Sequence, residues 1–253
     1  MQTGNKTVHI YRIKWMNRRA CTNEAYIPTS IEHVANIATH GIWIIPSVIC
    51  SVRLFRYSST SDQYISSYVY GTSLILLFGV STIFHSVQYC NYHRSLKDAL
   101  HRCDRAMIYI FIAASYFPWL NIHNNELLHA MRYVIWIMAI MGILYQQLFH
   151  ERYKMLETIF YVVMGIGPSV MILKVYNYYD IMELKLGGLI YVFGLVFFKS
   201  DGRIPFAHAI WHLFVAVAAG FHYYAILKYV YNISVDGNVP PDETIRLIHD
   251  ALR

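Results

Sequence analysis

Apolar residues along the chain gather into seven windows, which short polar and charged connections separate. The windows lie near the length of about 20 residues that an α-helix needs to cross the hydrocarbon core of a bilayer. The pattern therefore predicts an all-α polytopic membrane protein, built as a bundle of seven transmembrane helices. The predicted spans are residues 34–54, 65–87, 106–120, 133–149, 159–173, 186–198 and 206–230.

The connections between the windows are too short to hold a separate soluble domain. We expect an N-terminal segment at residues 1–31, one membrane domain at residues 32–231 and a tail at residues 232–253. Pro46 and Pro168 remove backbone donors inside predicted helices, so kinks are expected at both positions.

The composition agrees with lipid as the solvent. Apolar residues make up 56% of the chain and charged residues 14%, against about 25% charged residues in soluble domains. The 22 tyrosines suit membrane interfaces, because a tyrosine ring is apolar and its tip is polar. The four cysteines form no CxxC pair, so neither a disulfide framework nor a thiolate zinc site is indicated. Membrane lipid is the expected partner, and nucleic acid is not.

Lysine and arginine are distributed unevenly between the two predicted sides of the membrane. Thirteen fall in the N-terminal segment and the connections on its side, and eight fall on the opposite side. Because cytoplasmic segments carry the excess of positive charge, the bias predicts a cytosolic N-terminus. With seven spans, the C-terminus is then extracytosolic.

Polar and ionisable groups inside a span are costly, so each is a functional candidate. Glu32, Asn36 and His40 recur at i, i+4 and i+8, which places them on one helical face. They can form a polar clasp that holds two helices together. The alternative is that they are direct metal ligands. Ser81 and His85 also share one face, at the end of the second span.

A metal site is predicted where several of these groups lie at the same depth in the bilayer. Asp104 opens the third predicted span, and His208 and His212 open the seventh at the i, i+4 spacing that can hold one metal ion. In the predicted topology these groups and His85 all lie on the cytosolic side. Three neutral imidazoles with one open position are typical of a catalytic zinc site. We therefore predict zinc bound by His85, His208 and His212, with Asp104 beside the metal's water and Ser81 in support. The alternative for each histidine is an ordinary hydrogen bond between helices.

Several blocks of the chain resemble the hallmark blocks of the progestin and adipoQ receptor family, which bacterial hemolysin III proteins share. The resemblance covers about residues 25–230 and is nearest to the monocyte-to-macrophage differentiation factor group. The blocks are EHVANIATH at 32–40, STIFH at 81–85, CDRAMIY at 103–109, FIAASY at 111–116, FFKSDG at 197–202, IPFAH at 204–208 and HAIWHLF at 208–214.

The resemblance implies a seven-helix bundle with a cytosolic N-terminus, and a zinc held by the same three histidines with Asp104 contacting the metal's water. It implies a receptor-like or regulatory protein in membrane and lipid signalling. More distantly the family resembles alkaline ceramidases, so the alternative is a zinc-dependent hydrolase of a ceramide-like lipid amide. In that alternative zinc hydroxide is the nucleophile and Asp104 is catalytic. The nearest group suggests Golgi or late endosomal and lysosomal membranes, with the plasma membrane left open.

Overall fold

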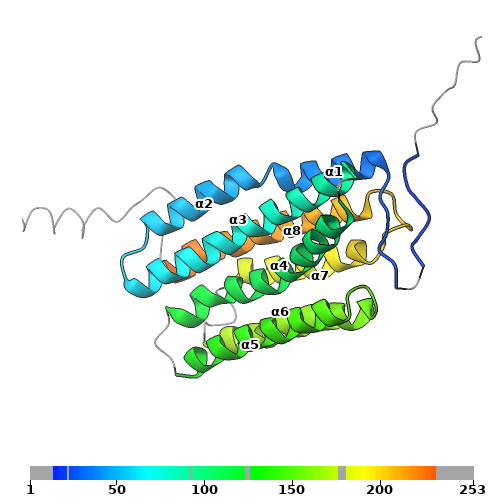
Figure 1. Ribbon diagram of the computed structural model, residues 1–253. Coiled ribbons are helices and arrows are strands. Elements are labelled where there is room, and N and C mark those ends of the chain that lie inside the picture. The colour runs from blue at the N-terminus through cyan, green and yellow to red at the C-terminus, as the bar shows by residue number, and fades with distance from the viewer. Residues whose placement is uncertain (1–13, 22, 92, 123–125, 176–180, 232–253) are drawn as a thin grey trace, which may run out of the picture.

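The computed structural model describes residues 14–21, 23–91, 93–122, 126–175 and 181–231. All regular elements within these residues are helices, which lie side by side in one bundle (Figure 1). The prediction of an all-α fold is therefore confirmed. The expected tail at 232–253 and the first 13 residues of the expected 1–31 segment lie outside the described residues, and the domain boundaries stay a prediction.

The helices follow the predicted windows in order, with the first and last windows each divided in two. Helix α1 runs directly into α2, and the last turn of the final window is a short π-helix, η1, that continues α8. The elements are α1 (Ser30–Gly41), α2 (Ile44–Arg56), α3 (Ser61–Tyr89), α4 (Arg94–Asn121), α5 (Glu126–Leu148), α6 (Lys154–Val175), α7 (Met182–Phe198), α8 (Ala207–Ala225) and η1 (Ile226–Val230).

Proline explains the break between α1 and α2. Pro46 has no N–H to donate to the carbonyl of Ile42 four residues earlier, so the helical ladder is interrupted near Ile42 and Trp43. The interruption confirms that Pro46 disturbs its helix. Pro168 lies inside α6, which continues through it without a break in the helix.

Helix α4 begins earlier than its apolar window predicts. It starts at Arg94, whereas the predicted span starts at residue 106. Asp104 therefore lies about three turns inside the helix and does not open it, which corrects the prediction. The reason is that an apolar window detects the part of a helix that suits lipid, while the charged residues before it are themselves good helix formers.

Among the described residues, five helical segments are long and apolar enough to cross a membrane: Ser30–Arg56, Ser61–Tyr89, Glu126–Leu148, Lys154–Val175 and Ala207–Val230. Their outward faces carry large apolar side chains such as Ile137 and Met141, about 60% exposed, as expected where lipid is the solvent. Helix α4 is charged through its first half and α7 has 17 residues, so a total of seven spans stays a prediction.

The packing of the bundle leaves a large internal space. Helix α3 packs against α1, α2 and α4, and α8 packs against α7 and α1. Helices α6 and α7 make little contact with each other. Between them and the rest of the bundle lies a cavity of about 1490 Å³, lined by residues of α1, α3, α4, α6, α7 and α8 and of the N-terminal segment.

Candidate metal centre

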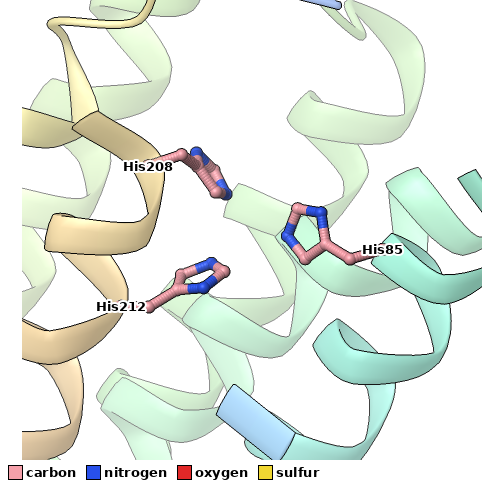
Figure 2. A group of neighbouring side chains, drawn as sticks. All are labelled: His85, His208 and His212. Atoms are coloured by element: carbon pink, nitrogen blue, oxygen red, sulfur yellow. The ribbon is translucent and has the colours of Figure 1, made fainter. Parts of the chain in front are cut away.

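Three histidines from two helices meet in the wall of this cavity. His85 lies near the end of α3, and His208 and His212 lie in the first two turns of α8. Figure 2 shows the three rings gathered around a common space. One ring nitrogen from each lies within 4.8 Å of the others. His85 and His212 are each only 2% exposed, and His208 is partly exposed.

The residues fit a tetrahedral zinc ion. Two imidazole nitrogens at 2.0–2.1 Å from zinc lie roughly 3.3 Å apart at the tetrahedral angle, so small ring movements would bring these three nitrogens into place. Both ring nitrogens of His85 are buried without a hydrogen-bond partner among the described residues. Because buried polar groups are normally satisfied, these two nitrogens are what an unfilled metal site would leave, and His85 stays a candidate ligand.

Asp104 lines the same cavity and faces both His208 and Ser81. Its carboxylate does not join the group of ligand atoms that lie within 4.8 Å of one another, so it stands beside the candidate metal position. The Ser81 hydroxyl is buried next to the Asp104 carboxylate. Both residues lie where a water ligand could be oriented, and their roles stay a prediction.

Glu32 joins three segments at the same end of the bundle. Its carboxylate accepts hydrogen bonds from the Thr29 backbone N–H (2.8 Å), the Tyr26 hydroxyl (2.9 Å) and the Phe206 backbone N–H (3.4 Å). Phe206 precedes α8 in the left-handed region, with φ of 58°, a conformation that costs a residue with a large side chain roughly 1 kcal/mol or more. Glu32 thus connects α1 to the start of the helix that carries His208 and His212.

Asn36 and His40 lie deeper on the same face of α1. The His40 ring stacks on the His212 ring, with centroids 3.6 Å apart. Both ring nitrogens of His40 and both amide atoms of Asn36 are buried without hydrogen-bond partners among the described residues. Both side chains line the cavity, and His40 is not in the group of close ligand atoms. Within the described part of the chain, the side chain of Glu32 is the one on this face that makes hydrogen bonds to another segment.

A second polar cluster, the Arg105 network, lies at the same end of the cavity. Arg105 donates to Glu151 at 2.5 Å and to Glu157 at 2.8 Å, and Lys154 also contacts Glu151 at 2.5 Å. The two oxygens of Glu151 thus face two cations, so the cluster is better described as an ion-pair network than as a metal site. The network consists of His101, Arg105, His150, Glu151, Lys154 and Glu157.

The sequence pattern did not predict the Arg105 network. Its acidic members follow α5 and open α6, where a charge normally indicates only a solvated helix end. The usable signal was Arg105 itself, since an arginine next to Asp104 at the edge of an apolar span needs a partner. Burial by itself would raise the pKa of Glu151, but Arg105 and Lys154 lower it to about 2.

The sequence matches a known family of membrane proteins. Residues 29–223 match the model of a family described as Haemolysin-III related. The chain belongs to this haemolysin III family, which includes the progestin and adipoQ receptors, as the sequence blocks predicted. It is a multi-pass membrane protein of that family.

Among its relatives are proteins from animals and bacteria. The chain is 49% identical over 225 residues to the human (Homo sapiens) monocyte to macrophage differentiation factor, covering 88% of this chain and 94% of that protein. It is 33% identical over 206 residues to hemolysin-3 of Bacillus cereus, covering 79% of this chain and 92% of that protein. The predicted likeness to the monocyte-to-macrophage differentiation factor group is confirmed.

Proposed function

We propose that His85, His208 and His212 hold a zinc ion at the cytosolic end of the bundle, and that this centre hydrolyses the amide bond of a ceramide-like membrane lipid. One observation carries the proposal: the three histidines and Asp104 line a cavity of about 1490 Å³, large enough for a lipid. A sealed ion with four protein ligands would favour a structural role, whereas three ligands beside a large cavity favour catalysis.

A route from the bilayer into this cavity supports the choice of a lipid. Ile166 of α6 and Leu189 and Val192 of α7 line the cavity. The same three side chains are about half exposed. Since α6 and α7 make little contact with each other, a lipid could enter between them without leaving the membrane.

The chain's own residues have distinct parts in this proposal. Zinc, when bound, supplies Lewis-acid polarisation of a carbonyl and activates water near neutral pH. Asp104 accepts the proton of the attacking water and passes it to the leaving amine, while Ser81 orients the Asp104 carboxyl. The apolar walls formed by α6 and α7 hold the acyl chain and exclude bulk water.

A receptor-like or regulatory protein, in which the metal mainly joins helices, is the second candidate. The stack of His40 on His212 and the approach of His85 bring α1, α3 and α8 together, and this packing favours such a role. Both candidates contain zinc, so metal content does not separate them.

The experiment is lipid turnover by purified protein in lipid nanodiscs supplied with long-chain ceramide. Fatty-acid release is measured by mass spectrometry for wild type and Asp104→Asn, with zinc content determined for each. We expect turnover in wild type and a loss of about 10²–10⁴-fold in Asp104→Asn with zinc retained. Asp98→Asn, which alters an exposed carboxylate on the same helix, is the matched control and should retain full turnover.

Two results would contradict the hydrolase. Wild-type protein that contains zinc but releases no fatty acid from a panel of ceramides would leave the receptor-like role as the better description. Full turnover in Asp104→Asn would remove Asp104 from the chemistry.

A further inference from the structure

Thr39 of α1 contacts the Nδ1 atom of His212, one of the three candidate ligands. Its hydroxyl oxygen lies 3.1 Å from Nδ1 of His212, across 173 positions of sequence. The same oxygen lies 2.8 Å from the backbone carbonyl oxygen of Ala35 and 3.2 Å from that of Asn36. Thr39 therefore has three hydrogen-bonding neighbours for one hydroxyl group.

Counting protons assigns the direction of each bond. A threonine hydroxyl has one proton to donate and can accept through its lone pairs. The two carbonyl oxygens can only accept, so the Thr39 proton is directed to the backbone of α1. Toward His212 the hydroxyl is then available as an acceptor, which favours the tautomer with a proton on Nδ1 of His212. A neutral imidazole protonated on Nδ1 keeps its lone pair on Nε2.

His208 has a similar arrangement. Oδ2 of Asp201, in the connection between α7 and α8, lies 3.5 Å from Nδ1 of His208. A carboxylate only accepts, so it also favours the proton on Nδ1 and the lone pair on Nε2. Both histidines of α8 are thus backed on their Nδ1 side by an acceptor from another segment, whereas neither ring nitrogen of His85 has a partner among the described residues.

We propose that Thr39 is a positioning residue of the metal centre, which holds His212 in the Nδ1–H tautomer so that Nε2 can bind the metal. The inference rests on the metal site of the proposed function and not on its hydrolytic step. Metal-bound histidines generally donate their second N–H to an acceptor, and loss of that acceptor costs 10–100-fold in metal affinity. Thr39 also connects α1 to the metal site, although α1 supplies no ligand of its own.

The test measures zinc affinity of the full-length protein in detergent by competition with a chromogenic chelator. Thr39→Val keeps the shape of the side chain and removes the hydroxyl acceptor, while the backbone carbonyl of Asn36 remains near the His212 ring. Zinc affinity should therefore fall toward the lower end of the 10–100-fold range, by about 10-fold. Thr39→Ser restores a hydroxyl and should return to within a few-fold of wild type. Substitution with Co²⁺ adds a spectroscopic test, since a displaced His212 should change the visible absorption of the bound ion in Thr39→Val alone.

Thr82→Val is the matched control. The Thr82 hydroxyl also donates to a backbone carbonyl of its own helix, that of Phe78 at 2.7 Å. Thr82 lies beside Gly41 where α1 meets α3, and the structure records no histidine partner for it among the described residues. This variant should bind zinc as wild type does. If Thr39→Val does not fold, judged by circular dichroism, Thr39→Ala takes its place.

The outcomes separate the inference from the proposed function. Wild-type affinity in a folded Thr39→Val protein would overturn the role of Thr39 and leave the metal site intact. Equal losses in Thr39→Val and Thr82→Val, or no rescue by serine, would show that the hydroxyl supports only helix packing. Wild-type protein that binds no zinc would overturn the metal centre itself, and the role of Thr39 with it.

Discussion

Replacing Glu151 with glutamine removes one charge from the Arg105 network and keeps the shape of the side chain. The carboxylate has Arg105 and Lys154 each at 2.5 Å, and its side chain is 8% exposed. Burial by itself would raise the pKa of Glu151, but the positive charge of Arg105, aided by Lys154, lowers it from the ordinary value of 4.5 to about 2. The folded protein therefore stabilises the charged form of this group.

The size and direction of the effect follow from the two pKa values. The folded pKa of Glu151 is about 2.5 below the ordinary one, which corresponds to about 3 kcal/mol of unfolding free energy. Because the folded pKa is depressed, this stability is fully present above pH 4.5 and is lost as the pH falls toward 2. The glutamine variant lacks it at every pH. The difference between the two proteins should be about 3 kcal/mol at pH 7 and pH 5, and roughly half of that at pH 3.

The assay is reversible unfolding in mixed detergent micelles, followed by circular dichroism at pH 7, 5 and 3. Glu151 raises the pKa of the neighbouring His150, which burial lowers to about 4, and lies 3.6 Å from His101. Both proteins therefore carry His101→Ala and His150→Ala, so that neither histidine titrates in the comparison. Asp98→Asn is the control, since Asp98 pairs with Arg94 at 4.0 Å on an exposed surface and its loss should have no measurable effect on stability. A difference that stays constant from pH 7 to pH 3 would refute the stabilisation of the Glu151 charge by the network.

Three further outcomes are expected. His208→Ala and His212→Ala should each lower the zinc content of purified protein, measured by elemental mass spectrometry, while His129→Ala should leave it unchanged; equal zinc in all three would rule out the assigned ligands. Glu32→Ala leaves the Thr29, Tyr26 and Phe206 donors without their acceptor, so it should lower the unfolding free energy by about 1–3 kcal/mol, and an unchanged melting temperature would contradict this. A reporter at the C-terminus should lie outside the cytosol, and a cytosolic signal would reverse the predicted orientation.

Local features of the fold were open to prediction from the sequence. The apolar windows located the described helices of the bundle. Each segment separately must either bury its apolar side chains in the protein or expose them to lipid. The spacing of His208 and His212 placed them on one face of α8 through helical geometry alone. The ends of the helices were harder to predict from the sequence. As α4 shows, charged residues can extend a helix beyond the part that suits lipid.

Contacts between distant segments were not open to prediction in the same way. Arg105 meets Glu151 and Glu157 across 46 and 52 positions of sequence, since α4 packs against the start of α6. No periodicity within either helix specifies which charges will be brought together. The same holds for the cavity, which exists because α6 and α7 stand apart while their neighbours pack closely.

The histidine site shows which features follow from the sequence and which depend on the tertiary structure. The sequence by itself determined which residues are candidates for a site, because costly polar residues recur at helical spacing at one end of several spans. Only the tertiary structure brought His85 of α3 to the pair on α8 and set the Thr39 hydroxyl behind His212. The physical reason is that helical spacing aligns residues within one segment, whereas the tautomer and direction of a ligand depend on how two helices cross.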